Sequence, residues 1–180
     1  MRIFIALDIP AGVRAGLTKY MERARLLAPE ARWARVEGLH VTLKFVGEAS
    51  EARVDEMKTA LASVKAAPFV MHFTGVGFFP NPNAPRVFWA GVDGGDHLPH
   101  LASTIDVALE KHGFPRETKP YHPHLTLART SARPLRELQQ LLADPPPQFG
   151  TMTAREFFLY RSQPQKGGSK YTRLERFTLD

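Results

Sequence analysis

The hydrophobic positions in the first half of the chain predict an alternation of strands and helices. Two windows carry apolar residues at three- and four-residue spacing, as expected for an amphipathic helix with one buried stripe. Around them lie short runs rich in Ile, Val and Phe, which are typical of strands. Ser50 is placed to cap the second helix. The pattern predicts helices at residues 13–27 and 50–64, and strands at residues 2–7, 33–36, 40–46 and 69–79.

The second half of the chain repeats this order of elements. Its pattern predicts two further helices, the second of them short and capped by Ser131, and four further strands. Gly167 and Gly168 separate the last two strands, so residues 162–170 are expected to form a flexible hairpin loop or lid. The predicted helices cover residues 97–112 and 131–142, and the predicted strands cover residues 86–92, 124–129, 149–161 and 171–178.

One short motif occurs twice, on a predicted strand each time. His40-Val41-Thr42-Leu43 is repeated as His124-Leu125-Thr126-Leu127, 84 residues later. The same spacing carries Arg2-Ile3-Phe4 onto Arg86-Val87-Phe88, and repetition at a fixed period indicates an internal duplication. We therefore expect a single bilobal domain over residues 1–180, with approximate halves 1–82 and 83–180.

Strands and helices that alternate in this way favour an α+β fold with two pseudo-symmetric lobes. Each lobe is expected to be a mostly antiparallel sheet with two helices on its outer face. The two sheets would then face each other across a central cleft. Side chains two apart on a strand point to the same face, so each copy of the motif would present one imidazole and one hydroxyl to that cleft.

Two histidines and two threonines in one cleft suit the hydrolysis of a phosphate ester by general acid–base catalysis. Because an imidazole titrates at about pH 6.5, one ring can be neutral while the other is protonated. The neutral ring would take a proton from water, and the protonated ring would give one to the leaving oxygen. The hydroxyls of Thr42 and Thr126 would donate to the non-bridging phosphate oxygens. The residues alone do not divide the two roles between His40 and His124.

Three further residues are candidate substrate contacts. Lys44 shares the face of His40 and Thr42 on a regular strand and would add positive charge, with a solvated lysine at the strand end as the alternative interpretation. Arg129 lies on the opposite face of a regular strand, and it reaches a phosphate only if a bulge re-aims it. Tyr121 is placed to stack a base at the rim of the cleft, with a place in the core as the alternative.

Neither a metal nor another cofactor is expected. His122 and His124 alternate, but Pro123 interrupts the strand geometry between them, and no neighbouring Asp or Glu completes a ligand set. The 180 residues include no cysteine, which excludes disulfides, thiolate catalysis and Cys-based zinc sites.

The charge of the chain indicates an anionic partner. Its formal net charge is +6 and its pI is about 9.8, and nucleic acid is the commonest partner of basic proteins, although arginines spread over a solvated surface give the same count. No stretch approaches the roughly 20 apolar residues of a membrane-spanning helix, and the first apolar run is too short for a signal peptide. We expect a cytoplasmic monomer without membrane contact.

The two motifs and their surroundings resemble the 2H phosphoesterase family. Within it they are most similar to the RNA 2′,3′-cyclic phosphodiesterase branch, historically called 2′-5′ RNA ligase. The resemblance spans nearly the whole chain, and the doubled motif is its most specific part. It rests on residues 2–6, 40–47, 85–91 and 123–129, and on Tyr171-Thr172-Arg173-Leu174, which resembles the family's closing Tyr-x-x-Leu.

This resemblance implies a bilobal fold and the hydrolysis, without metal, of the 2′,3′-cyclic phosphate at an RNA end to a 2′-phosphate. It also implies that His40 is the proton donor and His124 the proton acceptor, and that RNA ends bearing a cyclic phosphate are the partner. Reversible 2′-5′ joining of RNA ends would be the same chemistry run backward. Two other functions stay open: an RNA-end-binding module without turnover, and a phosphodiesterase that acts on a small cyclic nucleotide.

Overall fold

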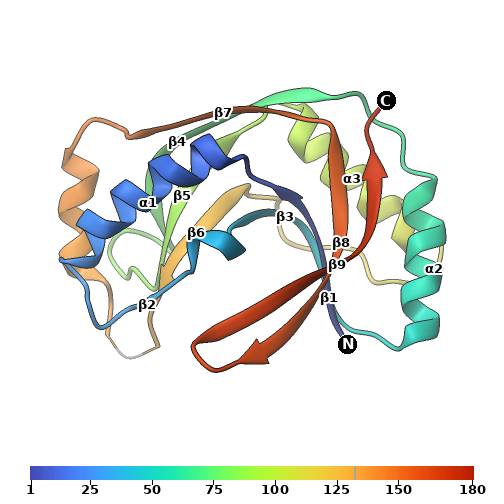
Figure 1. The fold of residues 1–180 in the computed structure, drawn as a ribbon, viewed down its shortest axis with the longest axis horizontal. Helices are drawn as coiled ribbons and strands as arrows, with labels where there is room; N and C mark the ends of the chain where they lie inside the picture. The colour runs from blue at the N-terminus through green and yellow to red at the C-terminus, as the bar shows by residue number, and fades with distance from the viewer. Residues whose placement is uncertain (132) are drawn as a thin grey trace.

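The strands of the protein form two antiparallel sheets (Figure 1), seen in a computed structural model that describes residues 1–131 and 133–180. The four-stranded sheet contains, in spatial order, β3 (His40–Glu48), β1 (Arg2–Asp8), β8 (Glu156–Gln165) and β9 (Gly168–Thr178). The five-stranded sheet contains β2 (Arg32–Trp33), β6 (His124–Arg129), β5 (Val87–Asp93), β4 (Phe69–Phe79) and β7 (Gln148–Ala154).

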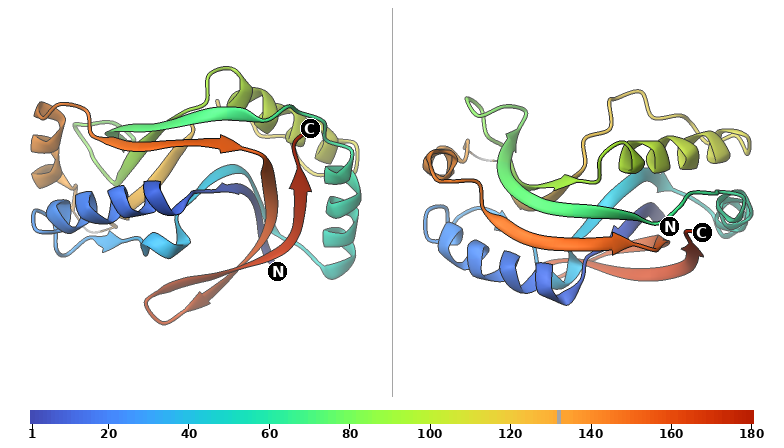
Figure 2. Two further views of the ribbon diagram at one scale, coloured as in Figure 1. Left: turned by 45° about the horizontal axis from the view of Figure 1, so that its top comes forward. Right: turned by 90° about the horizontal axis from the view of Figure 1, so that it is seen from above.

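The helices lie in two groups, at opposite ends of the molecule (Figure 2). At one end, α1 (Ala11–Arg25) packs against β7, and the 3₁₀ helix η2 (Arg136–Ala143) lies against β4. At the other end, α2 (Glu51–Ala62) and α3 (His97–Glu110) pack together, and α3 contacts β3. A short 3₁₀ helix, η1 (Val36–Gly38), leads into β3. The predicted α+β fold is confirmed, and within the described ranges no helix is long and apolar enough to span a membrane.

The two sheets repeat one strand order, but each is built from both halves of the sequence. At the 84-residue spacing, β1 corresponds to β5, β3 to β6 and β4 to β8. The orders β3-β1-β8 and β6-β5-β4 are therefore equivalent, with β4 and β8 exchanged between the halves. The spatial lobes thus do not coincide with residues 1–82 and 83–180, and neither half can complete its own sheet.

The alternation of side chains along β1 shows how the floor of the cleft is built. Ile3, Ile5 and Leu7 are at most 1% exposed and belong to the main core. Phe4 and Ala6, on the opposite face, form a second small apolar cluster together with Phe158 and Tyr160 of β8. Because apolar side chains cover both faces of β1, the strand beside His40 is buried and held from two sides.

One predicted strand is in fact two strands of different sheets. The pattern over residues 149–161 predicts a continuous strand, but β7 ends at Ala154 and β8 begins at Glu156. The chain passes between the sheets at Arg155. No glycine or proline marks this point, and the apolar residues continue on both sides of it, so the prediction of one strand was wrong.

The segment expected to be a flexible hairpin loop or lid is a regular β-hairpin. The ladder between β8 and β9 continues to the pair formed by Gln165 and Gly168. Only Lys166 and Gly167 form the turn, and Gly167 has a φ of 82°, which an L side chain rarely adopts. The hairpin tip extends beyond the rest of its sheet (Figure 1).

Two further boundaries differ from the prediction. The strand expected at residues 33–36 ends at Trp33, and Val36 already begins η1. The short helix does not begin at Ser131, because Pro134 disfavours helical backbone at Arg133, and the helix that forms is the 3₁₀ helix η2. Part of the predicted start, Ala132, lies outside the described residues.

Ser50 does cap α2, since its hydroxyl accepts from the backbone N–H of Arg53 at 3.3 Å.

Candidate active site

The two motif strands present their histidines and threonines to one groove. His40 and Thr42 on β3 are half-buried, as are His124 and Thr126 on β6, while the residues between and after them belong to the core. All four side chains line a single groove with a volume of about 790 Å³. The period-two pattern of the sequence therefore predicted correctly which faces of these strands meet.

Both strands contain a β-bulge directly after the motif threonine. In β3, Thr42 pairs with Ala6 but Lys44 pairs with Ile5, which leaves Leu43 as an extra residue. In β6, Thr126 and Ala128 pair with neighbouring residues of β5, which leaves Leu127 as the extra residue. A bulge reverses the alternation beyond it. Consequently Lys44 and Ala128 are buried, and the next residues, Phe45 and Arg129, line the groove.

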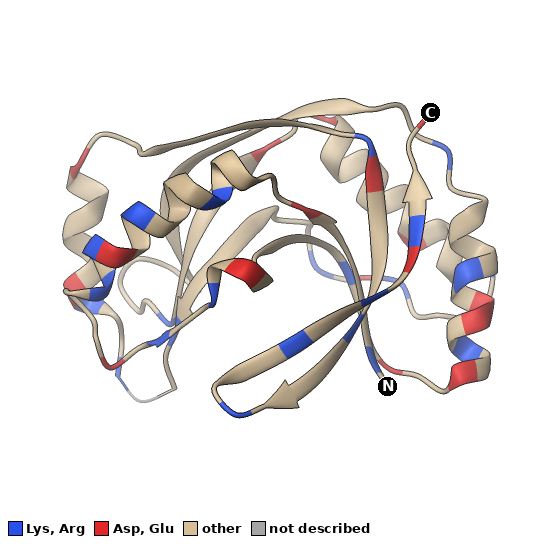
Figure 3. Ribbon diagram, in the orientation of Figure 1, with Lys and Arg blue, Asp and Glu red and all other residues tan. Residues whose placement is uncertain are grey.

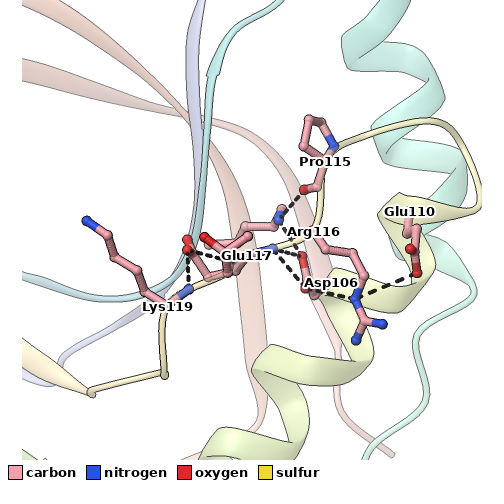
Figure 4. A network of polar contacts seen from close by, with 8 residues as sticks. Asp106, Glu110, Pro115, Arg116, Glu117 and Lys119 are labelled. Atoms are coloured by element: carbon pink, nitrogen blue, oxygen red, sulfur yellow. Dashed lines mark hydrogen bonds and ion pairs between the residues drawn. The ribbon is translucent and has the colours of Figure 1, made fainter.

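Lys44 does not share the face of His40, contrary to the prediction for a regular strand. Its side chain is buried, and its Nζ donates to the carboxylate of Asp106 on α3 and to the carbonyl oxygen of Pro115 at 2.9 Å. Asp106 also accepts from the backbone N–H of Glu117 at 3.1 Å and lies 3.6 Å from Nε of Arg116 (Figure 4). Lys44 thus fastens β3 to α3 and to the segment that follows it.

The other two candidate contacts have different outcomes. Arg129 lines the groove, because the bulge at Leu127 turns its side chain to the groove face of β6. The hydroxyl of Tyr121 donates to the carbonyl oxygen of Thr42 at 2.9 Å, its ring packs against the core, and burial raises its pKa. Tyr121 therefore braces β3 and does not present its ring to the groove for a base.

Each motif histidine is oriented by a backbone carbonyl two residues before it. Nδ1 of His40 lies 2.8 Å from the carbonyl oxygen of Gly38, and Nδ1 of His124 lies 2.6 Å from that of His122. A carbonyl only accepts, so Nδ1 carries the hydrogen in both rings. Nε2 is then the nitrogen that gains and loses a proton in each ring.

The surroundings lower the pKa of both imidazoles below the usual value. Burial is the main cause for His40, the charge of His124 adds to it, and the hydrogen bond to Gly38 opposes it. Burial is also the main cause for His124, the charges of His122 and Arg129 add to it, and the hydrogen bond to the His122 carbonyl opposes it. The influence of His124 on His40 is the electrostatic interaction expected of two groups that border one groove.

Aromatic rings hold the imidazole of His40 in place. The ring of Phe4 stacks on it at 4.6 Å between centroids, and the ring of Tyr171 meets it edge-on at 5.2 Å. Tyr171 also packs on Gly38, where an added Cβ would lie 3.1 Å from the tyrosine ring. At the other side of the groove, Phe79 meets His124 edge-on at 4.9 Å. The imidazoles of His40 and His124 are therefore confined by hydrogen bonds and by packing.

The groove is strongly basic. Lys and Arg segments lie along the β8–β9 hairpin and around β2 (Figure 3). No Asp or Glu is among the described residues that line the groove, and its cationic side chains are Arg2, Arg32, Arg35 and Arg129. Such a surface favours phosphate groups. In the part of the chain that the structure describes, no group of three or more His, Cys, Asp or Glu side chains is arranged to hold a metal ion.

Sequence reasoning missed several of these groove residues. Arg32 lies in the two-residue strand β2 and Arg35 follows it, and no recognisable motif marks either residue. Phe45 could have been found, because the 84-residue spacing maps it onto Arg129 and so gives it the same place relative to the motif. Strict alternation along a strand places Phe45 and Arg129 on the face that points away from the groove.

The two-sheet fold and its paired motif strands belong to a known class of phosphoesterases. The model of the family described as LigT like Phosphoesterase matches residues 7–89 and 92–171. The chain therefore belongs to the LigT-like phosphoesterase family. This confirms the family that the two motifs resemble.

Individual relatives match over almost their full length. An RNA 2′,3′-cyclic phosphodiesterase of Archaeoglobus fulgidus is 32% identical, over 98% of this chain and 99% of the relative. A crystal structure of a Thermus thermophilus protein has a TM-score of 0.84 at 31% identity, and the match covers 99% of this chain and 98% of the other. Escherichia coli LigT in complex with 3′-AMP has a TM-score of 0.80 at 28% identity, with 99% and 97% covered.

The buried ion pair gives a prediction for stability. Lys44→Met removes the buried partner of the Asp106 carboxylate and leaves it only the exposed guanidinium of Arg116 at 3.6 Å, so the free energy of unfolding should fall by up to about 3–5 kcal/mol in urea denaturation. Lys44→Met combined with Asp106→Leu should recover part of this loss, because no unpaired charge remains. Lys58→Met is the matched control, since Lys58 pairs with an exposed carboxylate at 3.8 Å and its loss should change stability by less than about 1 kcal/mol. Equal effects of the two single substitutions would contradict this assignment.

The lowered pKa values predict the pH dependence of turnover. If the two histidines serve as general acid and general base, one must be protonated and the other neutral, so kcat/KM should follow a bell whose maximum lies below the ordinary imidazole value of about 6.5. Arg129→Gln removes a positive charge that lowers the pKa of His124. That pKa should rise, and the limb of the bell that reports on His124 should move to higher pH. A profile whose limbs keep their positions in this variant would argue against the coupling.

Proposed function

We propose that this protein hydrolyses the 2′,3′-cyclic phosphate at an RNA end to a 2′-phosphate, without a metal ion, by general acid–base catalysis between His40 and His124. One observation carries the proposal: both imidazoles line the same basic groove, each with Nδ1 held by a carbonyl and each beside a threonine two residues on. The substrate is supported by the name of the Archaeoglobus relative, RNA 2′,3′-cyclic phosphodiesterase.

The proposed reaction consists of one displacement at phosphorus. Nε2 of neutral His124 takes a proton from water, and the water oxygen bonds to phosphorus. The bond between phosphorus and the 3′ oxygen breaks, and Nε2 of protonated His40 gives its proton to that oxygen. The 2′ oxygen keeps the phosphate, so the product is a 2′-phosphate with a free 3′ hydroxyl. Each proton transfer is worth roughly 10²–10⁴ in rate.

The electrostatic environment favours this division of roles. The positive charge of Arg129 lowers the pKa of His124, which favours the neutral form that a general base requires. The charge of His124 lowers the pKa of His40, and this effect disappears when His124 is neutral. A phosphate anion bound beside His40 would then favour the protonated form that a general acid requires.

The remaining groove residues fit contacts to phosphate. The hydroxyls of Thr42 and Thr126 and the guanidinium of Arg129 are donors that could bind the non-bridging oxygens, where negative charge shifts during the displacement. Arg32 and Arg35 suit further phosphates of an RNA strand. If the 5′ hydroxyl of a second RNA replaced water, the same steps would join the two ends through a 2′-5′ linkage.

The test is the incubation of the purified protein with an oligoribonucleotide that ends in a 2′,3′-cyclic phosphate, in the presence of EDTA. We expect undiminished turnover and a 2′-phosphate product, because both proton transfers use side chains of the protein. His40→Ala and His124→Ala should each lower kcat by about 10²- to 10⁴-fold. His100→Ala, at an exposed position on α3, should leave kcat unchanged and serves as the control.

Four outcomes would contradict parts of this proposal. Loss of turnover in EDTA would point to a metal-dependent hydrolase. Tight binding of the oligonucleotide without turnover would point to an RNA-end-binding module. Turnover of mononucleotides alone would replace RNA by a small cyclic nucleotide as the substrate, and a 3′-phosphate product would reverse the assignment of the leaving oxygen.

A further inference from the structure

The outer part of the β8–β9 hairpin is an exposed basic arm. From Phe157 to Leu174 the chain contains no Asp or Glu, although 18 of its 180 residues are acidic. Every residue from Pro164 to Arg173 is exposed, and none of them belongs to either apolar cluster of the core. Figure 3 shows Lys and Arg on this arm and no acidic residue near its tip. The tip therefore adds nothing to the core, although ordering it costs conformational entropy.

The cations of the arm divide into a paired and an unpaired group. At its base, the guanidinium of Arg173 binds the carboxylate of Asp8. Nearer the tip, neither Lys166 nor Lys170 forms an ion pair with any Asp or Glu that the structure describes. A phosphate group would supply the anion that no side chain supplies there.

The tip of the hairpin meets a third cation, which comes from the other sheet's side of the groove. Arg35 lies between β2 and η1 and lines the groove. Its guanidinium is so close to the turn that a Cβ added at Gly167 would lie 2.9 Å from Nη2. Arg35 also has no ion-pair partner among the described residues. Arg35, Lys166 and Lys170 thus form one basic track along the hairpin.

This basic track begins beside the proposed reaction centre. The ring of Tyr171 contacts that of His40 at 5.2 Å between centroids, and Lys170 directly precedes Tyr171 on β9. Lys170 also lines a smaller hollow that His40 and Tyr171 border as well. At about 3.4 Å per strand residue, the turn lies roughly 10–15 Å from Tyr171. A stacked RNA strand carries one phosphate per 3.4 Å or so, and an extended strand fewer, so about two to four nucleotides span this distance.

A cyclic phosphate at an RNA end leaves one direction for the rest of the strand. Its 2′ and 3′ oxygens are both in the ring, so every further nucleotide is attached through the 5′ oxygen of the terminal ribose. In the proposed reaction the 3′ oxygen lies at His40, which puts this ribose and its strand on the side of the four-stranded sheet. The β8–β9 hairpin belongs to that sheet.

We propose that Arg35, Lys166 and Lys170 bind the phosphodiester backbone of the nucleotides that precede the cyclic end, so that the protein prefers an oligoribonucleotide to a mononucleotide. This inference rests on the proposed function and extends it from the reacting phosphate to the strand. Lysine and arginine contacts to phosphate do not read the base. The preference therefore depends on strand length and on salt, and not on sequence.

The experiment compares a mononucleotide with an oligomer. Adenosine 2′,3′-cyclic phosphate has no phosphodiester beyond the ring, whereas a hexaadenylate with the same cyclic end has five. We measure the ratio of kcat/KM for the hexamer to kcat/KM for the mononucleotide. In Lys166→Gln combined with Lys170→Gln, this ratio should fall about 3- to 30-fold, and Arg35→Gln should lower it further. Lys166→Arg combined with Lys170→Arg keeps both charges and should restore the ratio.

Salt dependence gives a second readout, which a merely structural role would not move. The product hexamer with a 2′-phosphate is bound without turnover, and the logarithm of its Kd changes with the logarithm of salt concentration. For a single strand this slope is about 0.7 per phosphate contact, so the double Gln variant should lose about 1.4 of it. Lys65→Gln combined with Lys111→Gln removes the same charge from exposed positions after α2 and α3, and it should leave ratio and slope unchanged.

The inference can fail independently of the proposed function. A wild type that does not prefer the hexamer, or a double Gln variant that keeps the ratio and the slope, would overturn the basic track. Equal effects of the hairpin and control variants would also overturn it, because net charge alone would then explain the preference. If the wild type turns over neither substrate, the proposed reaction is wrong, and the salt slope for the 2′-phosphate hexamer still decides whether the track binds the strand.

Discussion

One extra residue in each of two strands decides which side chains the groove presents. Leu43 in β3 and Leu127 in β6 are the bulged residues at equivalent positions. Without them, Lys44 would face the groove and Phe45 would face the core. A buried ammonium group is costly unless it is paired, so the bulge in β3 also requires the carboxylate of Asp106. The bulge and the buried ion pair therefore depend on each other, and the composition of the site follows from both.

The relative placement of the two motif strands is held by polar contacts from β3 to the segment before β6, as well as by the core. Nζ of Lys44 donates to the carbonyl of Pro115, and the hydroxyl of Tyr121 donates to the carbonyl of Thr42. Both contacts join β3 to the segment that leads into β6. Because β4 and β8 are exchanged between the halves, the two sheets also share one continuous core. The two imidazoles are thus fixed by their own strands, by the segment before β6 and, through the buried ion pair between Lys44 and Asp106, by α3.

Local pattern predicted most of the elements and the four motif side chains, but not the features that depend on pairing between strands. Alternation identified the groove faces of His40 and His124, since that rule is intrinsic to a strand. A bulge is a property of two strands in register, and nothing in Thr42-Leu43-Lys44 alone reveals it. The exchange of β4 with β8 and the passage between sheets at Arg155 could likewise not be predicted from the sequence, because the apolar pattern is the same whichever sheet a strand joins. Gly167 was recognised as a turn residue because its backbone requirement is local.

In the proposed reaction, a duplicated motif acts in one direction on an asymmetric substrate. Burial lowers the pKa of both histidines and so favours the neutral form of both rings in the free protein. A phosphodiester brings a negative charge that favours protonation of an adjacent imidazole. The cation of Arg129 opposes that effect at His124, whereas the equivalent residue on the side of His40, Phe45, carries no charge. The substrate would therefore protonate His40 selectively, because the residues after the bulges differ although the motifs before them match.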